Sequence, residues 1–424
     1  MIRVKTENIC EFILLVLIMF YVLIAHWIWV GRGVQESLMI FLSAVILLPK
    51  KIKSPRLKDC EEFVLVLLFV LFCAYTTLKA VSIPYFSSDI KFMAGTFAVA
   101  LALIKTYKNK PDFSENFLYI LFKWLNIYMF FNSFIIIAQY FSPYFMMNRS
   151  VLANMNNEAY FDQITGFLGM NGTTRWSIWS LLTIVLNFNR YYEYKNKKIF
   201  RYNIFFICLS LVLSMLNSSR GFFVSLPLTI IIYFLVVRRV SINVKFKYFV
   251  CLIAAFLAVG ILYAISPTVK GLIDSSVGGK IELYASGDVD RMIASGDDRA
   301  AAVAAGVEYG GMYGEGIGSI PMHLAGDAEI RYLGLNSASS YIYMIGVFGY
   351  FLYAFVLARL VVTMCFGKDK LYIFKTIVFM IYFAILSYLL PIYSNIALLG
   401  GIFFIAMAFA SNVKLENKLH PIDE

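Results

Sequence analysis

Long runs of apolar residues, separated by short polar segments, are the dominant pattern in this 424-residue chain. Because the runs lack the alternation of apolar and polar positions typical of half-buried strands, we expect helices that are apolar on all sides. A helix needs roughly 20 residues to cross the hydrocarbon core of a bilayer, and about twelve runs approach that length. They lie at residues 9–30, 34–49, 62–83, 90–105, 117–141, 175–189, 203–217, 221–237, 248–266, 336–360, 371–390 and 395–411.

The composition of the chain also indicates a membrane protein. Hydrophobic residues make up 60% of the chain and charged residues 15%, whereas a typical soluble domain carries about 25% charge. The first run is too long for a cleavable signal peptide and lacks the small-residue cleavage pattern. The predicted fold class is therefore an all-α integral membrane protein with one large, partly helical loop. Its parts are a transmembrane bundle at 1–266, the loop at 267–335, and the last transmembrane helices with a cytoplasmic tail at 336–424.

Basic residues give the chain a formal net charge of +11. Most of the 37 lysines and arginines fall near the chain ends or in alternate loops, all on one side of the membrane in the twelve-helix topology. Cytoplasmic loops carry such an excess of Lys and Arg, so both termini are predicted to be cytoplasmic. The basic character therefore reflects topology, and we expect no nucleic-acid partner. The basic loops are 50–60, 105–112, 190–202, 238–247 and 367–375.

Cysteine, histidine and acidic residues restrict the chemistry. The six cysteines all fall in predicted helices or cytoplasmic loops, so neither a disulfide framework nor a zinc site is expected. We expect no metal and no cofactor. The predicted helices also lack the series of buried Asp, Glu or His that proton-coupled transporters use.

Three segments are predicted on the non-cytoplasmic side: 142–174, the short turn around Arg220, and the loop 267–335. Loops longer than about 12–15 residues are usually functional or disordered. Within the long loop, the Ala-rich stretch 297–311 predicts a short helix that an aspartate opens, and the Gly-rich stretch 314–321 predicts a turn. We therefore expect this loop to fold over the outer face of the bundle.

Arg220 stands at the predicted start of a helix on the outer side, where the preceding Asn217, Ser218 and Ser219 are able to cap the first amides. A helix N-terminus carries a partial positive charge and Arg220 adds a full one, which together favour a bound phosphate. An arginine that extends its side chain to the membrane interface explains the same position equally well. The position of Arg220 in the sequence leaves both interpretations open.

Further arginines on the outer side favour the phosphate interpretation. Arg175 follows Thr173 and Thr174, two candidate capping residues, at the start of a predicted helix. Arg299 begins the Ala-rich helix, and Arg331 precedes the helix predicted at 336. Short outer segments are normally poor in arginine, so a shared function is needed to explain the set. Several guanidinium groups that bind one pyrophosphate would supply it.

Three segments, in this order, resemble the O-antigen ligase and polymerase superfamily. They are LNSSRGFFVSLPLTIII at 216–232, DRAAAVAAGVEYGGMYGEGIGSI at 298–320 and LGLNSASSYIYMIGVFGYFL at 333–352. The first resembles the family's Ser-Arg-Gly segment at a helix start. The second resembles the family's arginine that is followed, about ten residues later, by a Gly-x-Gly-x-Gly turn. The resemblance in architecture covers most of the chain.

The third segment resembles the family's segment that re-enters the membrane, with Asn336, Gly346 and Gly349 in register. In the ligases, a histidine that is a candidate base usually precedes this asparagine. Leu335 occupies that position here. The departure weakens the ligase interpretation and favours a polymerase.

The resemblance implies a multi-pass protein of the bacterial inner membrane with a periplasmic loop, which joins undecaprenyl-pyrophosphate-linked glycan repeats into a surface polysaccharide. Its donor and acceptor would both be lipid-linked glycans, the bilayer would be a partner, and a chain-length regulator protein is a further expected partner. Arg175, Arg220 and Arg299 would stabilise the departing pyrophosphate. Substrate contacts are expected from Ser218, Ser219, Arg331, Asn336 and Tyr313, and His323, Asp298 and Glu315 are candidate bases. The alternatives are a flippase for the same lipid-linked unit and a ligase.

Overall fold

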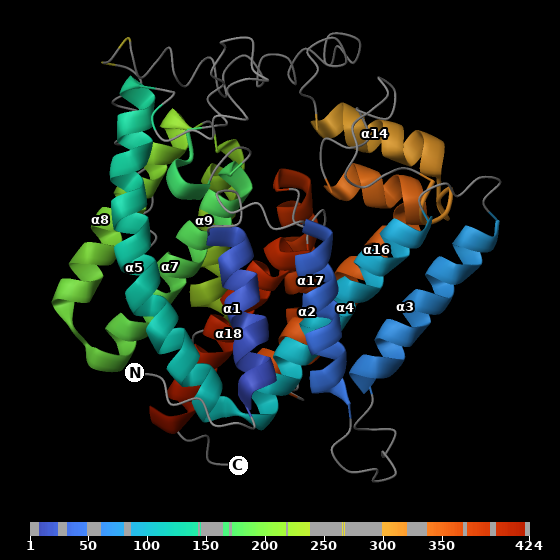
Figure 1. Ribbon diagram of the computed structural model, residues 1–424, viewed down its shortest axis with the longest axis horizontal. Helices are drawn as coiled ribbons and strands as arrows, with labels where there is room; N and C mark the ends of the chain where they lie inside the picture. Colours follow the sequence, from blue (N-terminus) through green and yellow to red (C-terminus); the bar gives the residue numbers. More distant parts are fainter. Residues whose placement is uncertain are drawn as a thin grey trace. The chain divides into compact units, whose positions relative to one another are not determined.

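The computed structural model describes residues 8–23, 32–48, 61–79, 86–142, 145, 164–168, 172–217, 219–237, 265, 267, 299–319, 337–367, 371–390 and 396–419. Within these ranges the chain is helical and contains no strand (Figure 1). The α-helices are α1 (Ile9–Leu23), α2 (Arg32–Leu47), α3 (Glu61–Leu78), α4 (Phe86–Asn109), α5 (Pro111–Phe141), α7 (Thr173–Tyr194), α8 (Lys197–Leu216), α9 (Arg220–Ile232), α14 (Arg299–Gly310), α16 (Ser337–Phe366), α17 (Tyr372–Leu389) and α18 (Ile396–Leu419). A 3-10 turn, η4 (Gly166–Leu168), and a π turn, η5 (Tyr233–Val237), complete the list.

Helices occur at the predicted apolar runs that the structure describes, and the run at 248–266 lies outside the described residues except for Ile265. In the described part, five helices are long and apolar enough to cross a membrane: α5, α8, α16, α17 and the first 19 residues of α18. Shorter apolar helices lie at Ile9–Phe20, Val34–Leu47, Phe63–Leu78 and Gly221–Ile232. The chain is thus a helical protein with the apolar helices of a membrane protein.

The chain divides into two compact units, and each gathers segments that are far apart in the sequence. Unit 1 contains α1 to α4, α14, α16, α17 and the start of α18. Unit 2 contains α5, α7, α8, α9 and the remainder of α18 from Phe404.

The core of unit 1 forms around α16, which packs against α3, α4, α14 and α17. Phe69, Phe97 and Tyr353 form one aromatic cluster, with each pair of ring centroids 5.3 Å apart. Arg359, buried in α16, binds the Glu61 carboxylate at the start of α3 with an Nη2–Oε1 distance of 2.6 Å. Neutralisation by Glu61 makes a buried guanidinium tolerable within an apolar helix.

The centre of unit 2 is α7, which packs against α8 and α9. Trp176 Nε1 donates to Ser214 Oγ at 3.0 Å, and Asn203 Nδ2 donates to Ile184 O at 3.2 Å, so α7 and α8 run antiparallel. Most residues of α7 are buried, including Ser177, Ser180, Thr183 and Asn187. These polar residues face protein rather than lipid, and for that reason α7 is less apolar than the helices beside it.

Candidate functional site

The starts of α7 and α9 lie side by side in unit 2. Ser219, the residue before α9, places its Oγ 2.8 Å from Ser177 Oγ and donates to Thr173 O at 3.2 Å. Thr173 and Ser177 belong to the first turns of α7. The fold therefore brings together the two helix starts that carry Arg175 and Arg220. We refer to Thr173, Ser177, Ser214, Asn217 and Ser219 as the α7–α9 junction.

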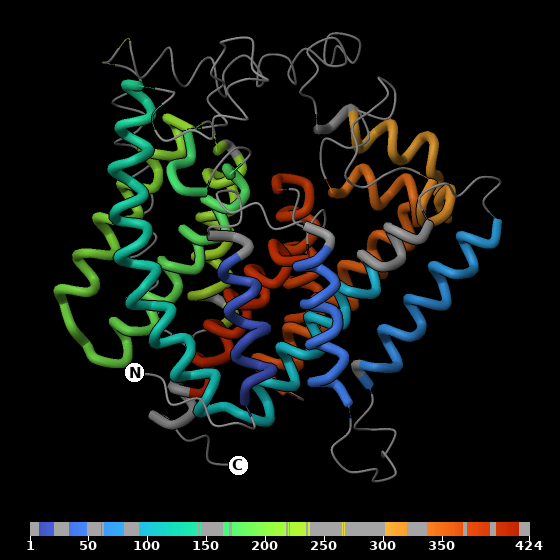
Figure 2. The backbone as a smooth tube through the Cα atoms, viewed as in Figure 1, coloured from blue at the N-terminus to red at the C-terminus, as the bar shows by residue number. Residues whose placement is uncertain are grey.

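A tight reversal between α8 and α9 forms this junction (Figure 2). Asn217 N donates to Leu213 O at 3.0 Å and ends α8, while Ser219 N donates to both Ser214 O and Asn217 Oδ1. Phe222 N then donates to Ser219 O and begins α9. Asparagine supplies this turn because its short side chain accepts a hydrogen bond from the backbone two residues later.

The predicted side-chain caps were wrong for Ser219, Thr173 and Thr174, and Ser218 lies outside the described residues. Ser219 occupies the position before α9, but its hydroxyl bonds α7 instead of the first amides of α9. Gly172 occupies the corresponding position before α7, and neither Thr173 nor Thr174 serves as the cap. The Ser219 hydroxyl, which the local sequence pattern predicted as a cap of α9, therefore forms a contact between α7 and α9 instead.

Arg175 is fixed by a hydrogen bond from its Nη1 to Leu168 O, at 2.7 Å. Leu168 ends the short turn η4. Side chains of α5, which precedes this turn in the sequence, bind its backbone. The turn that ends at Leu168 therefore holds the Arg175 guanidinium in place at the start of α7.

Two buried amides of α5 bind the turn that carries Leu168. Asn132 Nδ2 donates to Thr165 O at 3.2 Å, and Asn132 Oδ1 accepts from Phe167 N at 2.7 Å. Gln139 Oε1 accepts from Gly166 N at 2.8 Å. These two residues were not among the site residues predicted from the sequence. The signal was available, because polar residues seven apart lie on one face of a predicted apolar helix.

Several sequence-predicted site residues are described only in part. The backbones of Arg220 and Arg299 form the first residues of α9 and α14, and their side chains are not described. Arg220 belongs to unit 2 and Arg299 to unit 1. Ser218, Asp298, His323, Arg331 and Asn336 lie outside the described residues.

In unit 1, α14 lies along the first turns of α16 (Figure 1), and glycines allow the two backbones to touch. A Cβ atom on Gly306 would lie 2.8 Å from Ser339 O, and one on Gly310 would lie 2.5 Å from Ile342 O. Gly314 continues the same spacing of four and meets the backbone near Met344. This repeated small-xxx-small pattern is the sequence signal for close helix contact. Gly306 and Gly310 were predicted only as part of the Ala-rich helix, and Gly314 only as part of the turn.

Gly346 interrupts α16 with φ 73° and ψ 172°, a conformation that suits glycine. The Gly-rich turn after α14 satisfies the interrupted backbone. Glu315 N and Gly316 N donate to Tyr343 O and Met344 O, both at 2.9 Å, whereas Val347 N and Phe348 N donate to Gly311 O and Met312 O. Because a broken helix within a membrane protein needs internal partners for its backbone, the turn and the break depend on one another.

Tyr313 and Glu315 are exposed on this turn. Lys79 at the end of α3 places its Nζ 4.3 Å from the Tyr75 ring centroid and 5.6 Å from that of Tyr313. Thr77 Oγ1 accepts from Ile317 N at 3.1 Å. The end of α3 therefore anchors the turn, and the predicted substrate-contacting tyrosine lies beside a cation.

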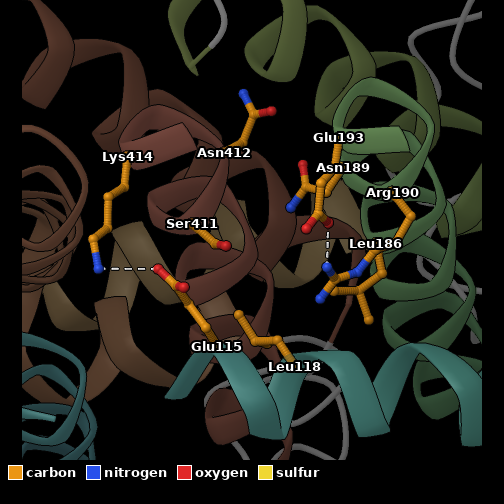
Figure 3. Close-up of a pocket in the computed structure, with 9 residues that line it drawn as sticks. All are labelled: Glu115, Leu118, Leu186, Asn189, Arg190, Glu193, Ser411, Asn412 and Lys414. Carbon is orange, nitrogen blue, oxygen red and sulfur yellow. Dashed lines mark hydrogen bonds and ion pairs between the residues drawn. The ribbon is translucent and has the colours of Figure 1, made fainter. Parts of the chain in front are cut away.

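Unit 2 also contains a small cavity at the opposite end of α7 (Figure 3). Two ion pairs border it, Glu115–Lys414 at 3.0 Å and Arg190–Glu193. Arg190 follows Arg175 by 15 positions, which corresponds to about 22 Å along an α-helix. The cavity of about 60 Å³ has room for a few water molecules but not for a glycan. It is therefore not the site that the sequence predicts around Arg175.

Comparison with known proteins gives no match: no family model, curated protein or solved structure is similar to this chain. Among the residues that the structure describes, no group of three or more His, Cys, Asp and Glu side chains is placed to hold a metal ion.

Proposed function

We propose that the chain is a membrane glycosyltransferase that polymerises glycan repeat units carried on undecaprenyl pyrophosphate. The observation that carries this proposal is the α7–α9 junction, where Ser219 joins the two helix starts that bear Arg175 and Arg220. Two helix N-termini in one place, whose first turns each include an arginine, favour an anion with several oxygens. A pyrophosphate leaving group has this chemistry.

Contacts within each unit support the prediction that successive helices cross the membrane in alternating directions. In unit 1, Lys105 at the end of α4 donates to Ile46 O at the end of α2, and Lys110 binds Glu11 at the start of α1. In unit 2, Lys414 near the end of α18 binds Glu115 at the start of α5. Each contact joins helix ends that the alternating topology puts on one side, the side rich in Lys and Arg. On the positive-inside rule we assign that side to the cytoplasm of a bacterium, with both termini there.

The same topology assigns the α7–α9 junction and α14 to the periplasmic face of the inner membrane. The twelve-helix arrangement and the periplasmic loop 267–335 belong to this proposal. A donor held at this face needs no nucleotide, because the pyrophosphate bond already activates the sugar.

In the proposed reaction, the bond between C1 of the donor glycan and the pyrophosphate oxygen breaks, and its electron pair leaves with the lipid pyrophosphate. C1 forms a new bond to a hydroxyl oxygen of the acceptor repeat unit. The hydroxyl proton passes to a base, for which Glu315, Asp298 and His323 are the candidates. Negative charge grows on the leaving group, so Arg175 and Arg220 would lower the barrier by binding it more tightly in the transition state.

The remaining roles come from the family resemblance. Arg299 would be a third cationic group on the pyrophosphate, and Arg331, Asn336, Ser218 and Tyr313 would contact the glycan. Ser219 has a structural contact that joins α7 to α9. Its role is therefore to position Arg220, whether or not it also touches substrate.

Reconstitution tests the proposal. The purified protein is placed in liposomes with the host's undecaprenyl-pyrophosphate repeat unit, without nucleotide or added metal, and polymer is followed by gel electrophoresis. Wild type should form polymer, and Arg175→Ala or Arg220→Ala should lower the rate by roughly 10²–10³. Arg201→Ala, on the exposed surface of α8, is the control and should keep the wild-type rate.

Two results would contradict the polymerase. One is polymer formation at the wild-type rate by both arginine variants. The other is movement of the lipid-linked unit across the membrane without any joining of repeats, which would indicate a flippase. Transfer of finished polymer to a lipid acceptor would indicate a ligase.

A further inference from the structure

The Asn217 side chain at the α7–α9 junction has a buried donor that the described protein does not satisfy. Asn217 is 0% exposed. Its Oδ1 accepts from Ser219 N at 3.1 Å, and its backbone N donates to Leu213 O. Among the described residues, Nδ2 has no hydrogen-bond partner.

The orientation of this carboxamide follows from the turn. Ser219 N can only donate, so the oxygen of the amide has to face it and the nitrogen has to face away. Both atoms belong to one planar group of Asn217, which is itself one of the junction residues. Buried amide nitrogens in proteins are nearly always hydrogen-bonded. The arrangement thus calls for an acceptor other than the described residues.

The surroundings indicate the chemistry of this acceptor. Two helix N-termini, each with partial positive charge, meet at the junction and outnumber the one helix C-terminus there, that of α8, whose partial charge is negative. Arg175 and Arg220 belong to the first turns of the same helices. Of the groups able to accept from an amide, an anionic oxygen is therefore favoured over a neutral one.

We propose that Asn217 is a phosphate-binding residue, whose Nδ2 donates to an oxygen of a phosphate group held at the α7–α9 junction. This inference rests on the proposed function in one respect, since it takes that phosphate to be the pyrophosphate of the lipid-linked substrate. The binding chemistry would be the same for a phospholipid headgroup. Asn217 then has two roles on its two atoms, as the oxygen stabilises the turn and the nitrogen binds the ligand.

Binding measurements on the full-length protein in nanodiscs test the proposal, with undecaprenyl pyrophosphate, inorganic pyrophosphate and phosphatidylglycerol as the three probes. Asn217→Ala removes both interactions of the side chain, whereas Asn217→Asp keeps the oxygen for Ser219 N and removes the donor. Asn203→Ala is the matched control. Asn203 is also a buried asparagine, and it donates to Ile184 O. It precedes Asn217 by 14 residues, which is about 21 Å along α8.

Wild type should bind undecaprenyl pyrophosphate, and both Asn217 variants should bind it about tenfold or more weakly. Asn203→Ala should keep the wild-type affinity even if it unfolds at a lower temperature. If Asn217→Ala lost affinity only because its turn is weakened, Asn217→Asp, which keeps the bond from Ser219 N, would regain that affinity. An equal loss of affinity in both variants therefore shows that Nδ2 binds the ligand. Loss confined to phosphatidylglycerol would assign the site to a membrane lipid. Wild-type affinity of either Asn217 variant for all three probes would overturn the proposal.

The outcome is independent of polymerase activity. If wild type binds the pyrophosphate probes through Asn217 but forms no polymer, the phosphate site stands and the proposed function fails. If wild type forms polymer and Asn217→Asp binds as wild type does, the inference about Asn217 fails and the proposed function stands.

Discussion

Ser177 and Ser219 stand 2.8 Å apart, Oγ to Oγ, although 42 residues separate them in the sequence. Both serines are buried. Ser177 follows Arg175 by two positions, and Ser219 directly precedes Arg220. This contact, together with the bond from Ser219 Oγ to Thr173 O, therefore links the first turns of α7 and α9. Any ligand that Arg175 and Arg220 share depends on it.

Replacing Ser219 with alanine should separate these two turns. The variant loses hydrogen bonds to Ser177 and Thr173, and we expect the free energy of unfolding to fall by about 1–2 kcal/mol. Polymer formation should fall more steeply than stability, because the arginine on α9 loses its position. Thermal unfolding in detergent and the polymerisation assay measure the two effects.

Ser225→Ala is the control for this variant. Ser225 is buried in α9 as well, but its hydroxyl contacts Phe222 O within its own helix. Similar losses of activity in the Ser219 and Ser225 variants would show that the contact between helices has no special importance.

Adjacent glycines provide a test of the contact between α14 and α16. In Gly310→Ala the new Cβ would lie 2.5 Å from Ile342 O, so the two backbones must separate and the protein should be destabilised by about 1–3 kcal/mol. Gly311 has φ +57° and no atom within 4 Å of a Cβ built on it. Gly311→Asn should therefore cost much less, since asparagine tolerates this left-handed conformation.

The measurement is limited proteolysis together with thermal unfolding of each variant. Equal destabilisation by Gly310→Ala and Gly311→Asn would mean that backbone conformation, and not the close approach of the helices, is what these glycines provide.

The ion pair between Glu61 and Arg359 should contribute more to stability than the more exposed pair between Glu115 and Lys414. The side chain of Arg359 is 6% exposed and that of Glu61 41%, whereas those of Glu115 and Lys414 are both 36% exposed, so only the first pair has a buried member. Glu61→Gln leaves a buried guanidinium without its carboxylate and should cost about 1–3 kcal/mol. Lys414→Met should cost about 0–1 kcal/mol, because solvent screens that pair.

Double-mutant cycles for each pair isolate the coupling from other effects of substitution. A coupling energy for the Glu115 pair as large as that for the Glu61 pair would contradict the argument from burial.

Local patterns in the sequence predicted the helices well, because the requirement for apolar side chains acts on each segment separately. They also identified Arg175 and Arg220 as residues at helix starts. Three features were missed although the sequence held a signal for each. The missed features are the amides Asn132 and Gln139 on one face of α5, the spacing of Gly306, Gly310 and Gly314, and the charge of Arg359 inside α16.

By itself, then, the sequence determined that this chain forms apolar helices, approximately where they lie, and that Arg175 and Arg220 stand near helix starts. Only the tertiary structure decided that Ser219 bonds α7 instead of capping α9, that Asn132 holds the turn beneath Arg175, and that α14 touches α16 through glycine. The physical reason is that hydropathy and charge are properties of single segments. Which faces meet depends on the fit of side chains and backbones that lie far apart in the chain.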